Sequence, residues 1–290
     1  MNAPIDKTGH GLLASADAIC AQLERAPFAV THTLSNHPLL QLPRLIELAA
    51  ALPPVEVEFN RADIPLSQEY LKTPPNGLSA TETLSQIENC QSWMVLKHIE
   101  ADPAYRRLLL ECLEPLRPLT EHITPGMRQP QAFIFVSSPG AVTPYHCDPE
   151  HNFLLQIRGG KTIAVFDRDD PLVVTQPELE AKVNGAHRNL IFQDAMQGRE
   201  TLFHLQPGAG VHVPMNCPHW VRVDDAVSVS LSITYRSRFS TRREAVLRLN
   251  SRLRKMGGEP APPGRHPLKD TMKFYTERVI RRVEHLAGKA

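Results

Sequence analysis

The sequence lacks the features that mark a membrane or secreted protein. No apolar run approaches the roughly 20 residues that a membrane-spanning helix needs. The five cysteines are odd in number and form no Cys-x-x-Cys pair, which argues against a disulfide framework. No basic segment followed by an apolar one marks a secretory signal near the first residue. We therefore expect a soluble protein of the reducing cytoplasm.

The composition indicates one dominant core. The chain has 290 residues, of which 42% are hydrophobic, so it can bury a substantial interior. We expect an N-terminal region of helices and strands at 1–125, a catalytic core at 126–240 and a helical C-terminal region at 241–290.

The C-terminal region is basic, and the remainder of the chain is acidic. Residues 241–290 carry 13 Lys or Arg and 5 Asp or Glu, a net charge of +8, so residues 1–240 carry −7. Apolar residues recur there at helical spacing, which predicts two amphipathic helices. We expect these helices to pack on the acidic body or to form a homodimer. Nucleic-acid binding is disfavoured, because no recognition-helix signature is present. The two apolar stripes consist of Val246, Leu249, Leu253 and Met256, and of Leu268, Met272, Tyr275, Val279, Val283 and Leu286.

Several signals define elements of the N-terminal region. An apolar pattern over 43–52 predicts a helix that ends before two prolines. A second helix is expected over 103–122, with Asp102 as its N-cap and internal prolines that split it. The polar stretch 60–80 is expected on the surface, and Trp93 in the core.

The segment Thr143–Asp148 carries the most informative motif. It places an imidazole, His146, and a carboxylate, Asp148, two residues apart, and residues at this spacing in a strand share one face. His219, 71 residues after Asp148, supplies a second imidazole. Two histidines and one carboxylate on one face leave three positions of an octahedral metal open, which is typical of non-haem Fe(II) oxygenases.

The residues after Asp148 read as two strands. Asn152–Ile157 and Thr162–Phe166 flank Gly159-Gly160, which predicts a β-hairpin that pairs Arg158 with Lys161. Alternation then places Lys161 on the same face as Asn152, Leu154 and Gln156. A buried lysine is costly without an anion, and a dicarboxylate co-substrate would provide one.

The strand at 227–235 alternates between apolar and hydroxyl residues. Its hydroxyl face holds Ser228, Ser230, Ser232 and Thr234. In a barrel this face leaves room for a polar ligand, whereas in a half-exposed strand it would contact solvent.

Together these segments resemble the JmjC-type, cupin-like Fe(II)/2-oxoglutarate oxygenases, a family that includes the asparaginyl hydroxylase of hypoxia-inducible factor and bacterial cupin-like proteins. The resemblance covers about residues 130–236. It implies a mostly β protein with flanking helices around a double-stranded β-helix, or jelly-roll, core. It also implies Fe(II) bound by His146, Asp148 and His219. The matching residues are Val142–Asp148, Asn152, Phe153, Gln156, Ile157 and Lys161.

The resemblance further implies how 2-oxoglutarate binds. Lys161 and Thr143 would contact its remote carboxylate, and Asn152 would lie near its metal-bound end. Ser232 stands where the family has a second asparagine, or Thr234 does if the register slips, and no upstream tyrosine matches the family's.

The expected function is therefore an Fe(II)- and 2-oxoglutarate-dependent dioxygenase. It would use O₂ to hydroxylate a C–H bond in a protein side chain, an amino acid or a small metabolite, with substrate contacts expected in the insertion at 167–203. Two other interpretations remain open. One is a metal cupin of the isomerase or lyase type, and the other is a ligand-sensing regulatory cupin protein.

Overall fold

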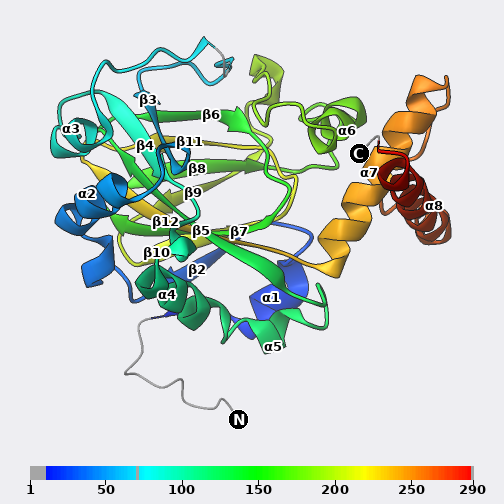
Figure 1. Ribbon diagram of the computed structural model, residues 1–290, viewed down its shortest axis with the longest axis horizontal. Helices are drawn as coiled ribbons and strands as arrows, with labels where there is room; N and C mark the ends of the chain where they lie inside the picture. Colours follow the sequence, from blue (N-terminus) through cyan, green and yellow to red (C-terminus); the bar gives the residue numbers. More distant parts are fainter. Residues whose placement is uncertain (1–10, 70–71, 289–290) are drawn as a thin grey trace.

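Two antiparallel β-sheets form the centre of the molecule (Figure 1). The structure is a computed structural model that describes residues 11–69 and 72–288. The large sheet has the order β1-β2-β10-β7-β12-β5-β4-β3, and the small sheet has the order β6-β11-β8-β9. The large sheet consists of β1 (Leu12–Leu13), β2 (Phe28–His32), β10 (Ala209–Val213), β7 (His151–Arg158), β12 (Ser228–Arg236), β5 (Arg128–Ser137), β4 (Ser92–Leu96) and β3 (Val57–Arg61). The small sheet consists of β6 (Val142–His146), β11 (His219–Val223), β8 (Lys161–Phe166) and β9 (Glu200–Leu205).

The two sheets face each other, because apolar residues of both share one buried cluster. Leu154 and Val211 of the large sheet pack in this cluster with Ile163, Val165 and Val221 of the small sheet. Two facing antiparallel sheets with this strand order are the architecture of a jelly roll. The expected mostly β fold with flanking helices is confirmed.

The other face of the large sheet packs against helices. In β12, Val229, Leu231, Ile233 and Tyr235 belong to the largest apolar cluster, together with residues of the covering helices. The opposite residues of β12 are also buried, so the half-exposed alternative for this strand is wrong. The covering helices are α1 (Ala16–Gln22), α2 (Leu42–Ala51), α3 (Ala80–Ser85), α4 (Pro103–Leu113) and α5 (Arg117–Thr120). Short 3-10 helices lie at Pro38–Leu40, Pro54–Glu56, Ile99–Ala101 and Asp194–Met196.

Local signals in the N-terminal region place these helices correctly. The Asp102 side chain accepts a hydrogen bond from the Ala104 N–H group at 2.8 Å, and Pro103 begins α4. The expected helix over 103–122 is split into α4 and α5, as its prolines predict.

Strands β2, β3 and β4 belong to the large sheet, so the region at 1–125 shares a sheet with the core. The three boundaries drawn from the sequence remain a prediction.

The predicted hairpin at Gly159-Gly160 is wrong. Strands β7 and β8 do not pair; β7 lies between β10 and β12, and β8 lies between β11 and β9. The two glycines form the corner at which the chain passes from the large sheet to the small one. A Cβ atom on Gly159 would lie 2.3 Å from the Val227 carbonyl oxygen, and one on Gly160 would lie 2.2 Å from Asp224 Oδ2. The close approach of the Val227 backbone therefore requires Gly159, whereas Gly160 faces the ends of the Asp224 and Gln206 side chains. Lys161 pairs with Leu205 and Val223.

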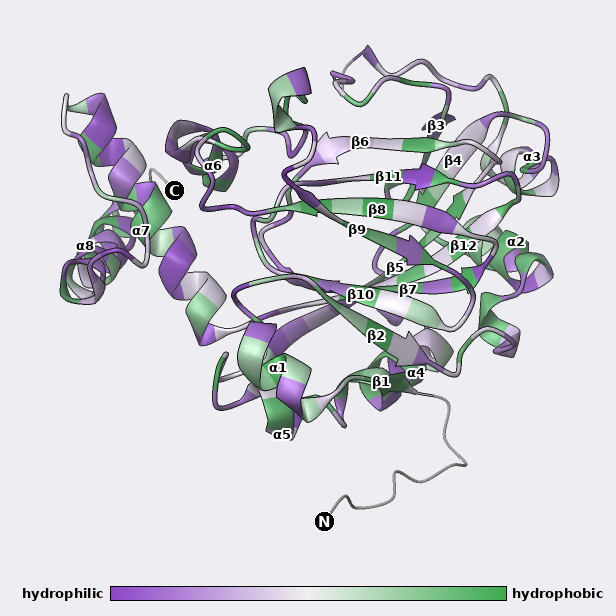
Figure 2. Ribbon diagram, turned by 180° about the vertical axis from the view of Figure 1, so that it is seen from behind, coloured by the Kyte–Doolittle hydropathy of each residue, from purple (hydrophilic) through white to green (hydrophobic). Residues whose placement is uncertain are grey.

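Three further helices lie at one end of the molecule, beyond the sheets (Figures 1 and 2). They are α6 (Gln176–Val183), α7 (Arg238–Lys255) and α8 (Pro267–Leu286). Helices α7 and α8 lie side by side, and the hydropathy colouring of α7 alternates between hydrophilic and hydrophobic turns (Figure 2). Over residues 11–69 and 72–288, no helix has the length and apolar character needed to cross a membrane.

Candidate metal centre

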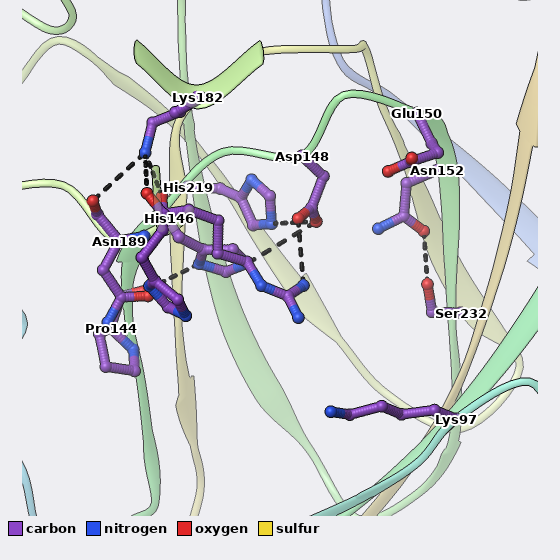
Figure 3. Close-up of polar contacts among 12 residues, drawn as sticks. Lys97, Pro144, His146, Asp148, Glu150, Asn152, Lys182, Asn189, His219 and Ser232 are labelled. Carbon is purple, nitrogen blue, oxygen red and sulfur yellow. Dashed lines mark hydrogen bonds and ion pairs between the residues drawn. The ribbon is translucent and has the colours of Figure 1, made fainter. Parts of the chain in front are cut away.

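His146, Asp148 and His219 converge at the ends of two neighbouring strands of the small sheet (Figure 3). His146 ends β6 and is the register partner of His219, which begins β11. Asp148 Oδ2 lies 3.8 Å from the Nε2 atom of each histidine, and the ligand atoms of all three lie within 4.8 Å of one another. Two atoms that each bind one ion at about 2.1 Å lie no more than about 4.2 Å apart. Both carboxylate-to-imidazole distances meet this limit.

Backbone carbonyl groups orient both imidazole rings. His146 Nδ1–H donates to the Pro144 carbonyl at 2.7 Å, and His219 Nδ1–H donates to the Cys217 carbonyl at 3.0 Å. A carbonyl can only accept, so the proton is on Nδ1 and the Nε2 lone pair of each ring faces the centre. The Asn216 N–H group donates to the Asp148 carbonyl at 2.7 Å, which ties the two ligand-bearing loops together.

The electrostatics keep His146 and Asp148 in their metal-binding forms. Burial and the neighbouring His219 lower the pKa of His146 to about 3, so this imidazole is neutral. Burial opposes ionisation of Asp148, but the neighbouring His146, the Arg188 guanidinium and His219 together lower its pKa to about 2. A neutral imidazole and an ionised carboxylate are the species that bind metal ions.

A cavity of about 150 Å³ lies beside the triad, between the two sheets. Lys161 lines it and is only 5% exposed, yet its ammonium group has no hydrogen-bond or ion-pair partner among the residues that the structure describes. Burial alone lowers the pKa of Lys161 to about 7. The cavity thus presents an unpaired cationic group to whatever occupies it.

The other residues expected to bind 2-oxoglutarate line the same cavity. Thr143 comes from β6, Asn152 from β7, and Ser232 and Thr234 from β12. Ser232 Oγ–H donates to Asn152 Oδ1 at 2.8 Å, so the Asn152 amide is oriented with its N–H groups free of partners within the described part of the chain (Figure 3). Gln156 lies outside this cavity, where its amide accepts from Ser230 and donates to the Gly159 carbonyl.

Several residues that sequence reasoning did not assign also line the cavity. Glu58 and Lys97 form an ion pair at 2.5 Å, Glu150 pairs with Arg236 at 2.9 Å, and Arg188 pairs with Asp148 at 3.2 Å. The insertion at 167–203 supplies Arg188, but nothing in its local pattern distinguished this residue from a solvated charge.

Two expectations for the N-terminal region require correction. Ile64 and Thr73 line the cavity, so the stretch 60–80 is not simply a surface segment. Trp93 also lines the cavity, rather than being enclosed in the core. Trp93 lies in β4 and packs against a cluster that contains Val223 of β11, and the Val142 N–H group of β6 donates to the Ala62 carbonyl. Such contacts between distant segments have no local signal.

Comparison with known proteins identifies the fold. No family model matches the sequence, and no curated protein does. The X-ray structure of Escherichia coli YcfD aligns with 93% of this chain and 68% of its own, at 16% identity and a TM-score of 0.51. A second structure, of YcfD as a ribosomal oxygenase with cobalt and 2-oxoglutarate, aligns over 93% and 67% at 16% identity and a TM-score of 0.49. A Bacillus subtilis oxalate decarboxylase aligns over 38% and 22% at 20% identity and a TM-score of 0.27. The first likeness agrees with the jelly-roll core derived above.

Proposed function

We propose that this protein is an Fe(II)- and 2-oxoglutarate-dependent dioxygenase that hydroxylates a C–H bond. The observation that carries the proposal is the combination of a His146–Asp148–His219 triad with an unpaired, buried Lys161 in the adjoining cavity. The triad would hold a metal ion and leave coordination positions open, and the lysine would pair with an anionic co-substrate. When bound, Fe(II) with 2-oxoglutarate and O₂ supplies the oxidising power for C–H hydroxylation.

Each residue of the centre has a defined task in this proposal. His146, Asp148 and His219 hold the metal from one side and leave the cavity side open. The Lys161 ammonium and the Thr143 hydroxyl hold the remote carboxylate of 2-oxoglutarate through charge-assisted and neutral hydrogen bonds. The oriented Asn152 amide, held by Ser232, donates toward the metal-bound end of the co-substrate.

The primary substrate would enter past the charged residues of the cavity. Glu58, Lys97, Glu150 and Arg188 come from different elements and surround the space that the co-substrate leaves. The substrate class remains a protein side chain, an amino acid or a small metabolite.

The two rival functions explain less of the centre. A metal cupin of the isomerase or lyase type commonly adds a glutamate as a further ligand, but the cluster found among the described residues has three members. That class has no need of a buried cation such as Lys161 beside the metal. O₂-dependent succinate formation separates the oxygenase from a ligand-sensing regulator.

Binding and turnover test the proposal. Purified protein should bind one Fe(II), or Co(II) as a surrogate, per chain, and should then bind 2-oxoglutarate. With Fe(II) and O₂ it should form succinate, even if slowly without the primary substrate. His146→Ala should abolish these properties, whereas His204→Ala, which removes an exposed imidazole outside the cavity, should retain them. Metal binding without 2-oxoglutarate binding would favour the non-oxygenase cupin.

We further propose that the protein acts as a homodimer through α8. Six apolar residues of α8 are between 59% and 84% exposed, while its Asp270 and Glu277 are buried. Arg252 of α7 binds Glu277 at 3.0 Å, and the Gly264 N–H group binds Asp270 at 2.7 Å. Helix α8 therefore turns its polar face inward and its apolar face outward. The six residues are Leu268, Met272, Tyr275, Val279, Val283 and Leu286.

A second copy of this chain fits the exposed stripe. The stripe runs the length of a 20-residue helix, so it can pack against its own symmetry mate in an isologous contact. We place the dimer in the cytoplasm, in keeping with five free cysteines.

A further inference from the structure

We infer that Arg188 and Lys182 form a clamp that holds Asp148 as a one-oxygen metal ligand and so keeps a coordination position open for co-substrate and O₂. The inference rests on the proposed function and assigns these two side chains as positioning residues.

The two oxygen atoms of Asp148 have different neighbours. Oδ2 faces both histidines at 3.8 Å (Figure 3), whereas Oδ1 accepts a hydrogen bond from Arg188 Nη1 at 3.2 Å. A carboxylate binds a metal ion through one oxygen or through both. The charge-assisted hydrogen bond from the guanidinium favours an orientation of the carboxylate in which Oδ1 faces Arg188 and Oδ2 faces the two imidazoles, so Oδ2 is the oxygen presented to the metal.

Lys182 fixes the loop that carries Arg188. It lies in the last turn of α6, and its ammonium group donates to three consecutive carbonyls, those of His187, Arg188 and Asn189, at 3.0, 2.6 and 3.2 Å. An ammonium group has three donors, so all of them are used on this loop. Figure 3 shows the Lys182 side chain pointing toward Asn189.

The same loop is joined directly to the metal-binding segment. The Cys147 N–H group donates to the Arg188 carbonyl at 3.2 Å, and the Leu190 N–H group donates to the Tyr145 carbonyl at 2.8 Å. The Arg188 carbonyl therefore contacts both Lys182 and the residue between the two ligands His146 and Asp148. A displacement of this loop would move the guanidinium relative to Asp148.

The clamp matters because it sets how many coordination positions of the metal remain open. Three single-atom protein ligands leave three positions on an octahedral metal, whereas a chelating Asp148 would leave two. If 2-oxoglutarate takes two coordination positions, no position would then remain for O₂. The Arg188 side chain is 51% exposed, so solvent screening makes its charge a small contribution to stability. Its effect lies in the geometry of the carboxylate.

The test uses the full-length protein loaded with Co(II), whose visible spectrum reports coordination number and geometry. Arg188→Gln should retain Co(II) but shift its visible bands before any co-substrate is added. Its affinity for 2-oxoglutarate, measured by calorimetry, should fall about tenfold, the lower end of the effect of partners that orient metal ligands. Lys182→Met should act in the same direction with a smaller change, and Arg188→Lys should restore part of the wild-type behaviour.

A matched control lies in the same insertion. Arg199 pairs with Asp170 at 2.6 Å and does not line the cavity, so Arg199→Gln should keep the wild-type spectrum and affinity. Thermal unfolding of each apoprotein checks that the variants fold.

The outcomes separate this inference from the proposed function. Wild-type spectrum and wild-type affinity in Arg188→Gln would overturn the clamp while leaving the oxygenase intact. If the wild-type protein bound Co(II) but not 2-oxoglutarate, the proposed function would fail. The clamp would then be judged by the spectrum alone, standing if Arg188→Gln shifts the bands and falling if it does not.

Discussion

The cavity and helix α8 both contain side chains in unfavourable surroundings. In the cavity a charged group is buried, whereas on α8 apolar groups are exposed. In the cavity, the charged Lys161 is buried without a counter-ion within the described residues. On α8, large apolar residues contact solvent while Asp270 and Glu277 are buried. A buried cation is satisfied by a small anion, whereas an exposed apolar stripe is satisfied by another protein surface. This difference is the basis for proposing a small-molecule site in one region and a dimer interface in the other.

The largest effect should come from removing a metal ligand. Asp148→Ala leaves two neutral imidazoles and no anionic ligand, so tight Co(II) or Fe(II) binding should be lost. Metal content after gel filtration and O₂-dependent succinate formation measure the result. Wild-type turnover by Asp148→Ala at saturating iron would show that this carboxylate is not a ligand.

The next largest effect is expected on α8. A charge placed at Val279 enters the proposed interface from both copies, and two lost contacts of about 2 kcal/mol each would weaken the dimer about 1,000-fold. Val279→Asp should therefore give a monomer at micromolar concentration in light scattering.

Val55→Asp is the control for α8, because Val55 is 78% exposed and lies outside the helix. A wild-type protein that is monomeric before any substitution would contradict the interface. The cavity should be unaffected, so both variants should bind 2-oxoglutarate as the wild type does.

Removal of the buried cation should weaken co-substrate binding. A charge-assisted hydrogen bond to a carboxylate contributes about 1.5–3 kcal/mol, so Lys161→Met should reduce 2-oxoglutarate affinity by about 10- to 150-fold. The same change should raise the thermal unfolding midpoint of the apoprotein, since it removes an uncompensated buried charge. Equal affinity in variant and wild type would mean that Lys161 does not contact the co-substrate.

The smallest effect is the pH dependence of the same group. Burial lowers the pKa of Lys161 from 10.5 to about 7, so between these values the unfolded chain binds a proton that the folded chain does not. The contribution of Lys161 to stability therefore rises with pH across this window. Binding of 2-oxoglutarate needs the charged form, so its affinity should fall above pH 7 and binding should take up a proton. Calorimetry in buffers of different ionisation enthalpy measures that uptake, which Lys161→Met should lack.

Short-range patterns predicted the parts of the molecule that depend on neighbouring residues. His146 and Asp148 are two residues apart, a spacing that predicted their closeness, although β6 ends at His146 and Asp148 lies in the loop that the Asn216 N–H group holds. The period of two in β12 similarly placed Ser232 and Thr234 on the cavity face. The roles assigned to Thr143, Lys161, Asn152 and Ser232 remain predictions, although all four line one cavity.

Other features depended on partners distant in the sequence. Gly159-Gly160 has the same local pattern as a hairpin turn, and only the positions of Val227 and Asp224 make it a corner between sheets. Arg188 contacts Asp148 across 40 residues, and Glu58 joins Lys97 through the pairing of β3 with β4. No periodicity records such contacts.

The sequence by itself determined which side chains could bind a metal and which faces of the strands and helices are apolar, because alternation and helical spacing are properties of the local backbone. Only the tertiary structure decided that Lys161 is buried without a partner, that Arg188 reaches one oxygen of Asp148, and that α8 turns its apolar face outward. These arrangements depend on which elements pack together, and packing is set by burial over the whole chain.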